Sequence, residues 1–225
     1  MANTLRWAIG GCPRSGTTWT AKVLSAGGMD TGHERIAADS YRILGEPALL
    51  DRGESSFATV PAFSKLRRQG TMTVQLVRAP LDGIASMWAR GISLEAGAVA
   101  DLARRHIPSI YAYSGVRRVA AYWCEWNLLG WGKADLVWRI HQTSRRDFEE
   151  LADRVGVPFE WRDTPVDVGH NRPAVTKDML GPELWHRVAH LSDVFGVPMR
   201  HDPVLTGPVP PVTGPQVVRV NPAKG

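Results

Sequence analysis

The stretch that decides the fold of this 225-residue chain lies near its amino end and reads Gly11-Cys12-Pro13-Arg14-Ser15-Gly16-Thr17-Thr18-Trp19. An apolar run, Leu5 to Ile9, precedes it, and a helical pattern follows it as far as Ala26. The pattern therefore predicts a strand, a glycine-containing loop and a helix in succession. In such a unit, the N–H groups of the loop and the first helical turn converge on one point, where the helix dipole adds positive potential. We expect a phosphate-type anion to bind at this point.

The loop departs from a nucleotide-binding P-loop at one position. The spacing of Gly11 and Gly16 matches the two glycines of that motif, and Thr18 stands at its Ser/Thr position. Thr17 occupies the place of the lysine, so a nucleotide kinase or ATPase would lose the cation that contacts the γ-phosphate. Arg14 instead brings a cation into the loop, and its planar guanidinium can bind two anionic oxygens at once.

Two later stretches repeat the strand-to-helix pattern. The apolar run Met72 to Val77 leads to Pro80, which opens a helix, and the run Leu136 to His141 leads to a helix from Ser144 to Val155. Further helices are expected near residues 36–44, 96–105, 116–129 and 182–195. Strands that alternate with helices predict an α/β protein with a parallel sheet covered on both faces. We therefore expect a three-layer fold of the P-loop type, with a central parallel sheet flanked by helices.

The composition fits one globular domain. Hydrophobic residues make up 44% and charged residues 22% of the chain, so disorder is expected only at the end. Beyond Thr206, closely spaced prolines exclude regular structure. We predict a single domain over residues 1–205 and a proline-rich tail over residues 206–225.

The formal net charge of +5 suits a ligand that carries several phosphate-type charges. The basic pairs are scattered along the chain rather than gathered in one stripe, which disfavours nucleic acid as the main partner. These pairs are Arg67-Arg68, Arg104-Arg105, Arg117-Arg118 and Arg145-Arg146.

The sequence favours a cytoplasmic location. No apolar stretch approaches the roughly 20 residues of a membrane span, and the run before Arg14 is too short for a secretory signal. Cys12 and Cys124 are too few for a disulfide framework. We expect Cys12 to pack beneath the loop as a small side chain, although a nearby helix N-terminus could lower the pKa of its thiol. The oligomeric state stays open.

The segment from Pro13 to Trp19 resembles the 5′-phosphosulfate loop of sulfotransferases. These enzymes move a sulfuryl group from 3′-phosphoadenosine 5′-phosphosulfate (PAPS) to a hydroxyl or amine and release adenosine 3′,5′-bisphosphate (PAP). The resemblance implies that the loop holds the donor, with Arg14 stabilising charge on the leaving phosphate. The residues implied in donor binding here are Arg14, Ser15, Gly16, Thr17, Thr18 and Trp19.

A second segment, Leu76 to Asp82 with a serine shortly after it, resembles the motif that holds the 3′-phosphate of PAPS. The resemblance implies this role for Arg78 and Ser86. The family usually has an acid where Ala79 stands, which leaves both phosphate ligands in place. Arg172, in a late polar loop, is the third expected contact to the nucleotide, although a simple surface loop is an equal alternative there.

The acceptor must lose a proton as it attacks, which calls for a general base. Glu34 is our choice, because its place after a second short strand resembles that of the catalytic glutamate in tyrosylprotein and several bacterial or carbohydrate sulfotransferases. His33 is the alternative, because cytosolic members use a histidine. Arg14 should act electrostatically, since arginine does not readily give up a proton.

The resulting hypothesis is a PAPS-dependent sulfotransferase that needs no metal ion. A sulfuryl group carries less negative charge than a phosphoryl group, and no apolar strand ends in the aspartate that normally holds Mg²⁺ beside a P-loop. The acceptor stays open among small molecules, peptides and carbohydrates. The alternative is a P-loop nucleotide or small-molecule kinase, which Thr17 disfavours.

Overall fold

The computed structural model describes residues 5–34, 52–92, 94–165 and 173–199. Its strands and helices, with 3₁₀ helices marked η, follow one another in the order given next. They are β1 (Trp7–Gly11), α1 (Thr17–Ala26), β2 (Thr31–His33), β3 (Gly53–Ser55), η3 (Phe57–Ala62), α2 (Phe63–Arg68), β4 (Met72–Val77), α3 (Pro80–Ala89), α4 (Ala98–His106), η4 (Pro108–Ala112), α5 (Gly115–Gly130), β5 (Leu136–Arg139), α6 (Arg145–Val155), α7 (Lys177–Leu180) and α8 (Pro182–Phe195).

The described strands form one five-stranded sheet in the order β2-β3-β1-β4-β5, and every pairing is parallel. The carboxyl ends of all five strands therefore lie at one edge of the sheet. From the central strand β1 the chain passes through α1 to the β2 side, and after β3 it returns through η3 and α2 to β4 on the other side. Such a reversal of strand order is where α/β sheets bind ligands. The loop after β1 stands at this point.

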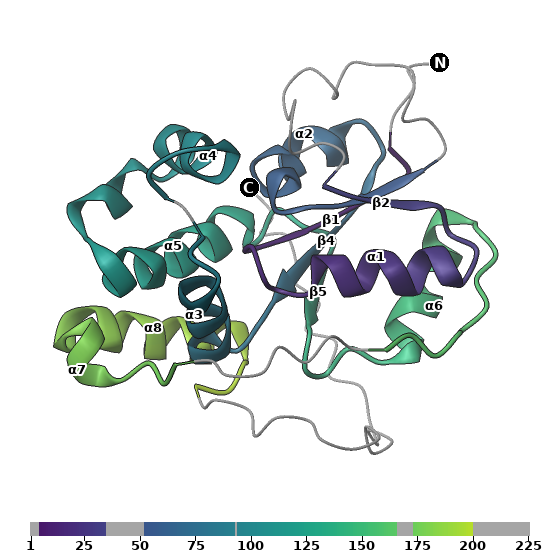
Figure 1. Cartoon of the computed structure of the whole chain (residues 1–225). Coiled ribbons are helices and arrows are strands. Elements are labelled where there is room, and N and C mark those ends of the chain that lie inside the picture. Colours follow the sequence, from purple (N-terminus) through teal and green to yellow (C-terminus); the bar gives the residue numbers. More distant parts are fainter. Residues whose placement is uncertain (1–4, 35–51, 93, 166–172, 200–225) are drawn as a thin grey trace.

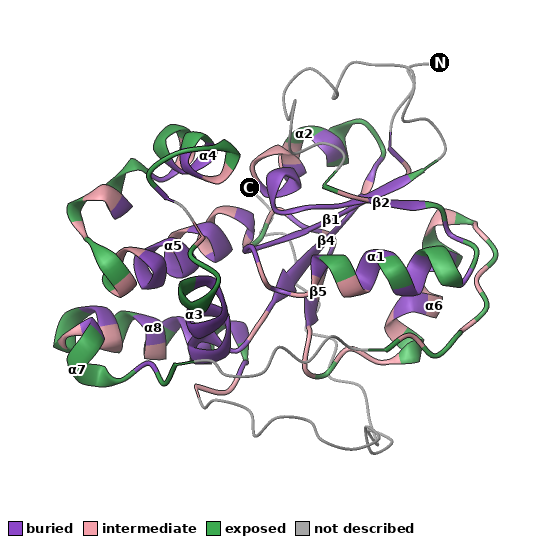
Figure 2. Ribbon diagram, in the orientation of Figure 1, coloured by how far each residue is buried: buried purple, intermediate pink, exposed green. Residues whose placement is uncertain are grey.

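Helices cover both faces of the sheet, which confirms the three-layer α/β prediction (Figure 1). On one face, α1 and α6 pack on β1, β4 and β5 through a cluster that includes Ile9, Val23, Val74, Trp138 and Phe148. On the other face, α3, α5 and α8 bury a larger cluster. The strands are buried over most of their length, and α1 alternates between buried and exposed residues as an amphipathic surface helix does (Figure 2).

Local sequence signals explain where the helices begin and end. The spacing of Ser144 and Asp147, three residues apart, predicts a helix cap. At the start of α6 the backbone N–H of Ser144 donates to the Asp147 carboxylate at 2.7 Å, in a capping box. Gly156 ends the same helix in a left-handed conformation, with φ of 63°. Pro80 stands in the first turn of α3, as expected.

The structure differs from the sequence-based expectations in three details. The Gly, Ser and Asp residues that follow Leu44 predict a loop, but the structure forms the strand β3 in this stretch. The last strand, β5, ends at Arg139, two residues before the expected end at His141. The helical spacing of Ile84, Met87 and Trp88 predicts that all three lie on a buried face. All residues of α3 from Pro80 to Met87 are buried, but Trp88 has 42% of its surface exposed. The helix expected at 36–44, the tail at 206–225 and Arg172 lie outside the described residues.

Among the helices that the structure describes, none combines the length and the apolar composition needed to cross a bilayer.

Candidate functional site

The loop between β1 and α1 owes its shape to two glycines that allow close approaches. A Cβ atom on Gly11 would lie 2.3 Å from the Ser15 hydroxyl oxygen and 2.6 Å from the Leu76 carbonyl oxygen. Gly16 has a φ of 103°, and a Cβ atom there would lie 2.8 Å from the Cδ1 atom of Ile140. Larger residues would therefore push the loop away from β4 and from the end of β5. The tight path brings the loop to the first turn of α1.

The start of α1 leaves its first N–H groups available to a ligand. Gly16 is the N-cap residue, and no side chain in the described parts of the chain caps the helix. The first N–H groups of any helix have no acceptor within that helix. Together with the helix dipole they form a positively polarised end that favours an anion.

The polar residues at the end of β3 hold the loop and α1 in place. The Ser55 hydroxyl donates to the carbonyl of Thr17 at 2.9 Å, and the N–H of Ser56 donates to the carbonyl of Ile9 at 2.9 Å. The Thr59 hydroxyl also donates to the Ile9 carbonyl, at 3.0 Å. All three side chains are buried. Sequence reasoning missed them, because no apolar pattern marks this segment as a strand.

Arg14 connects the loop to the second predicted motif. Its Nε atom donates to the Ser86 hydroxyl at 3.3 Å, and the Nη1 atom of Arg78 donates to the Arg14 carbonyl at 2.9 Å. Ser86 is buried on α3, while both arginines are half-buried. Three residues that the sequence predicts to bind the two ends of one nucleotide are therefore in contact, although more than sixty residues separate Arg14 from Arg78.

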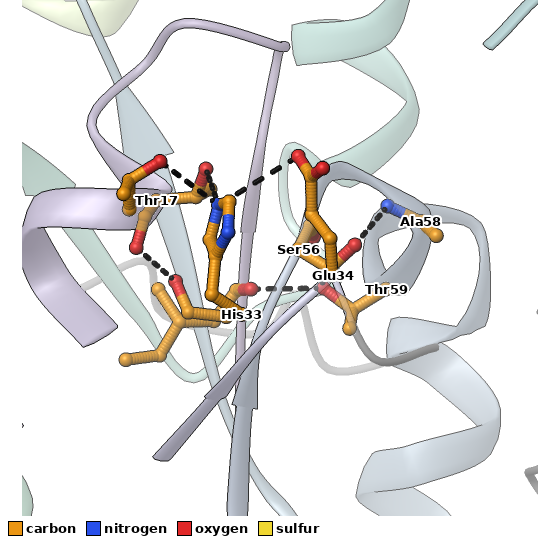
Figure 3. Close-up of polar contacts among 9 residues, drawn as sticks. Thr17, His33, Glu34, Ser56, Ala58 and Thr59 are labelled. Atoms are coloured by element: carbon orange, nitrogen blue, oxygen red, sulfur yellow. Dashed lines mark hydrogen bonds and ion pairs between the residues drawn. The ribbon is translucent and has the colours of Figure 1, made fainter. Parts of the chain in front are cut away.

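The predicted base residues lie on the other side of the same loop. The Nε2 atom of His33 is 3.0 Å from the Thr18 hydroxyl oxygen and 3.3 Å from that of Thr17. It is also 3.6 Å from the Oε1 atom of Glu34. The imidazole ring lies between the start of α1 and the Glu34 carboxylate (Figure 3). The structure thus brings both candidate bases to the loop between β1 and α1.

His33 and Glu34 differ in their surroundings. Burial lowers the pKa of His33 below its usual value, opposed by the nearby Glu34 carboxylate and reinforced by Lys22 on α1. The surroundings of His33 thus favour its neutral form over its protonated form. Glu34 keeps 42% of its side chain exposed, and its N–H donates to the Ser55 carbonyl at 3.4 Å. The Glu34 carboxylate is thus the group that an incoming molecule reaches more readily.

Two further predicted donor contacts, Ser15 and Trp19, have packed surroundings of their own. The Ser15 hydroxyl oxygen is buried beside Gly11 and has no hydrogen-bond partner among the described residues. The Ser15 N–H donates to the Cys12 carbonyl at 3.0 Å. Trp19 packs edge-on against Phe148, with ring centroids 5.6 Å apart, and its indole N–H donates to the Thr164 carbonyl at 3.3 Å. Trp19 thus lies on the α6 side of the sheet.

Cys12 is buried beneath the loop, as expected. Its sulfur accepts a hydrogen bond from the Asn127 amide at 3.4 Å, and burial raises the pKa of its thiol well above the usual value. Because a thiolate is the nucleophilic form, Cys12 is chemically inert here. The described residues contain no group of three or more His, Cys, Asp or Glu side chains placed to hold a metal ion.

Comparison of the chain with protein-family models and with curated proteins finds no match. A function is therefore inferred from the residues of this loop and from Arg78 and Ser86, which contact it.

Proposed function

We propose that the protein is a sulfotransferase that moves a sulfuryl group from PAPS to a hydroxyl or amine acceptor. The observation that carries the proposal is the meeting of Arg14, Arg78 and Ser86 at the start of α1. A 5′-phosphosulfate group bound at the loop would lie beside residues suited to a 3′-phosphate. ATP has no 3′-phosphate, and the loop has no lysine at the position of Thr17.

The residues have distinct roles in this proposal. The first N–H groups of α1 and the hydroxyls of Thr17 and Thr18 hold the 5′-phosphate, while Arg78 and Ser86 hold the 3′-phosphate. Arg14 stabilises the negative charge that develops on the leaving phosphate. For this task, Arg14 must exchange its hydrogen bond to Ser86 for one to the nucleotide. The long, flexible side chain of Arg14 allows this exchange.

The transfer itself is an in-line displacement. The acceptor oxygen forms a bond to sulfur as the bond between sulfur and the bridging oxygen of the 5′-phosphate breaks. Glu34 takes the acceptor's proton, and PAP leaves with the electrons of the broken bond. The acceptor approaches from the exposed side of Glu34. A small molecule, a peptide or a carbohydrate carrying a hydroxyl fits this description. The proposal places the reaction in the cytoplasm, a reducing compartment in which cysteines such as Cys12 and Cys124 stay free.

Calorimetric titration tests the donor class directly. The purified full chain is titrated with PAP, ADP and ATP, each with and without Mg²⁺. The proposal expects PAP to bind tightly in the absence of Mg²⁺ and to outcompete both other nucleotides. A preference for ATP with Mg²⁺ would overturn it in favour of the kinase.

A further inference from the structure

One imidazole nitrogen faces three oxygen atoms at the start of α1. The Nε2 atom of His33 lies within hydrogen-bond distance of the hydroxyls of Thr17 and Thr18, and the Glu34 carboxylate is slightly farther away (Figure 3). The ring stands on β2, whose partner strand β3 anchors α1 through Ser55. The sheet therefore fixes the distance between the ring and the two threonines.

The number of hydrogen atoms limits what these groups can do together. A threonine hydroxyl has one hydrogen and two lone pairs. If Nε2 carries no proton, it accepts that hydrogen, and the hydroxyl cannot donate it to an anion. If Nε2 carries a proton, it donates to a threonine oxygen, and the hydroxyl hydrogen is free to point at a bound anion. A protonated ring always has the second arrangement.

We propose that His33 is a positioning residue for the anion-binding loop, and that its Nε2–H turns the hydroxyls of Thr17 and Thr18 toward a bound phosphate. The inference rests on the proposed function, because the phosphate concerned is the 5′-phosphate of the donor. The two neighbouring residues then have different roles: His33 orients hydroxyls that bind the donor, and Glu34 takes the proton of the acceptor. Because a bound phosphate also favours the charged form of the ring, binding of the donor is accompanied by uptake of a proton.

The charges around the ring determine the direction of the pH effect. Among the described residues, the groups that face His33 are the Glu34 carboxylate on its own segment, and Lys22 and the two threonine hydroxyls on α1. Burial and Lys22 keep the pKa of the ring below its usual value, whereas a bound phosphate raises it. The affinity for the donor is therefore highest at low pH and falls as the pH rises through the pKa of the ligand-bound form.

The first measurement counts the protons taken up by the wild-type chain when PAP binds. Calorimetric titration at pH 7 in two buffers with different enthalpies of ionisation yields this number. We expect a clear fraction of one proton, and a PAP affinity that falls about three- to tenfold between pH 6.5 and pH 8. Both phosphates of PAP are mainly dianionic over this range, so the ligand contributes little. Tight PAP binding without proton uptake overturns the inference and leaves the proposed function standing.

Two variants separate positioning from a merely structural role. His33→Gln places an amide N–H₂ near the position of Nε2, and this group donates at every pH. We expect this variant to bind PAP within about threefold of the wild type, without proton uptake. His33→Ala removes the donor and is expected to weaken PAP binding about tenfold. Equal proton uptake by His33→Gln and the wild type would contradict the proposal.

Turnover with an acceptor found by screening distinguishes positioning from base catalysis. His33→Gln should keep kcat within about fivefold of the wild type when the donor is saturating, because the amide reproduces the hydrogen bond. A loss of a hundredfold or more would make His33 the general base and overturn the inference. A wild-type chain that binds no PAP at any pH would overturn the proposed function as well.

Discussion

Arg14 and Glu34 carry the two charges on which the proposed chemistry depends, and their side chains differ in exposure to solvent. The half-buried Arg14 contacts Ser86 and Arg78, so its charge acts in a medium that screens it weakly. Glu34 is exposed at the end of β2 and reachable by an acceptor. An electrostatic role suits the first residue and proton transfer suits the second.

Replacement of Glu34, the proposed base, should separate nucleotide binding from turnover. Glu34→Ala is expected to lower the turnover of a screened acceptor by roughly two to four powers of ten, since the attacking oxygen would have no group to take its proton. The affinity for PAP should stay within about threefold, as calorimetry can verify. Glu183→Ala, on the exposed first turn of α8, is the matched control and should leave both quantities unchanged. Near-normal turnover of Glu34→Ala would move the role to His33.

Ser86 permits a test of the proposed 3′-phosphate site. Ser86→Ala removes a buried hydroxyl, and we expect it to weaken PAP binding about tenfold while changing AMP binding much less, because AMP has no 3′-phosphate. Ser64→Ala, at a half-buried serine of α2, should affect neither ligand. If both nucleotides lost affinity equally, Ser86 would act only through its hydrogen bond to Arg14.

Among the elements, those with a local sequence signal could be predicted and those without one could not. The loop and α1 follow from a contiguous pattern, and α6 follows from its capping residues. The strand β3 has three residues, Gly53, Glu54 and Ser55, whose burial is set by neighbouring strands rather than by apolar side chains. For the same reason, the anchoring role of Ser55 and Thr59 could not be predicted. The contact between Arg14 and Ser86 depends on tertiary packing, which no local pattern encodes.

The connection between the loop and α1 can be tested at Gly16. We expect Gly16→Ala to lower the free energy of unfolding by at least about 1–2 kcal/mol, because its φ of 103° disfavours any Cβ atom and Ile140 occupies the required space. PAP affinity should fall too, since the clash displaces the start of α1. Gly132→Ala is the matched control: its φ is also positive, at 73°, but no atom lies within 4 Å of the added Cβ. Urea titration compares the two, and equal losses would mean that the contact with Ile140 contributes nothing.

At the scale of the whole molecule, one sheet separates two hydrophobic layers, and both cysteines belong to the layer formed by α3, α5 and α8. Cys12 lies under the loop between β1 and α1, and Cys124 lies on α5. Both thiols are buried, although only Cys12 lies beside the site. They can therefore report on opening of the loop and on unfolding of the whole layer separately.

Thiol labelling should reveal this difference. At pH 8 the native chain is expected to react very slowly with a thiol reagent, since burial raises the pKa of Cys124 to about 12, so that roughly one thiol in ten thousand is ionised. Both cysteines should react readily in denaturant. PAP should slow the reaction of Cys12 further without changing that of Cys124, as mass spectrometry of labelled peptides can establish. Fast labelling of native Cys12 would contradict the closed packing beneath the loop.

Arg14 and Glu34 are the two non-glycine residues in the described ranges with a positive φ, at 69° and 55°. The left-handed conformation costs a residue with a Cβ atom roughly 1–2 kcal/mol, and glycine largely avoids this cost. Evolution toward stability alone would thus replace both residues by glycine and erase the proposed chemistry. A library of this protein sorted for heat resistance should accumulate inactive variants at these two codons, which makes such sorting a way to locate a functional site without a known substrate.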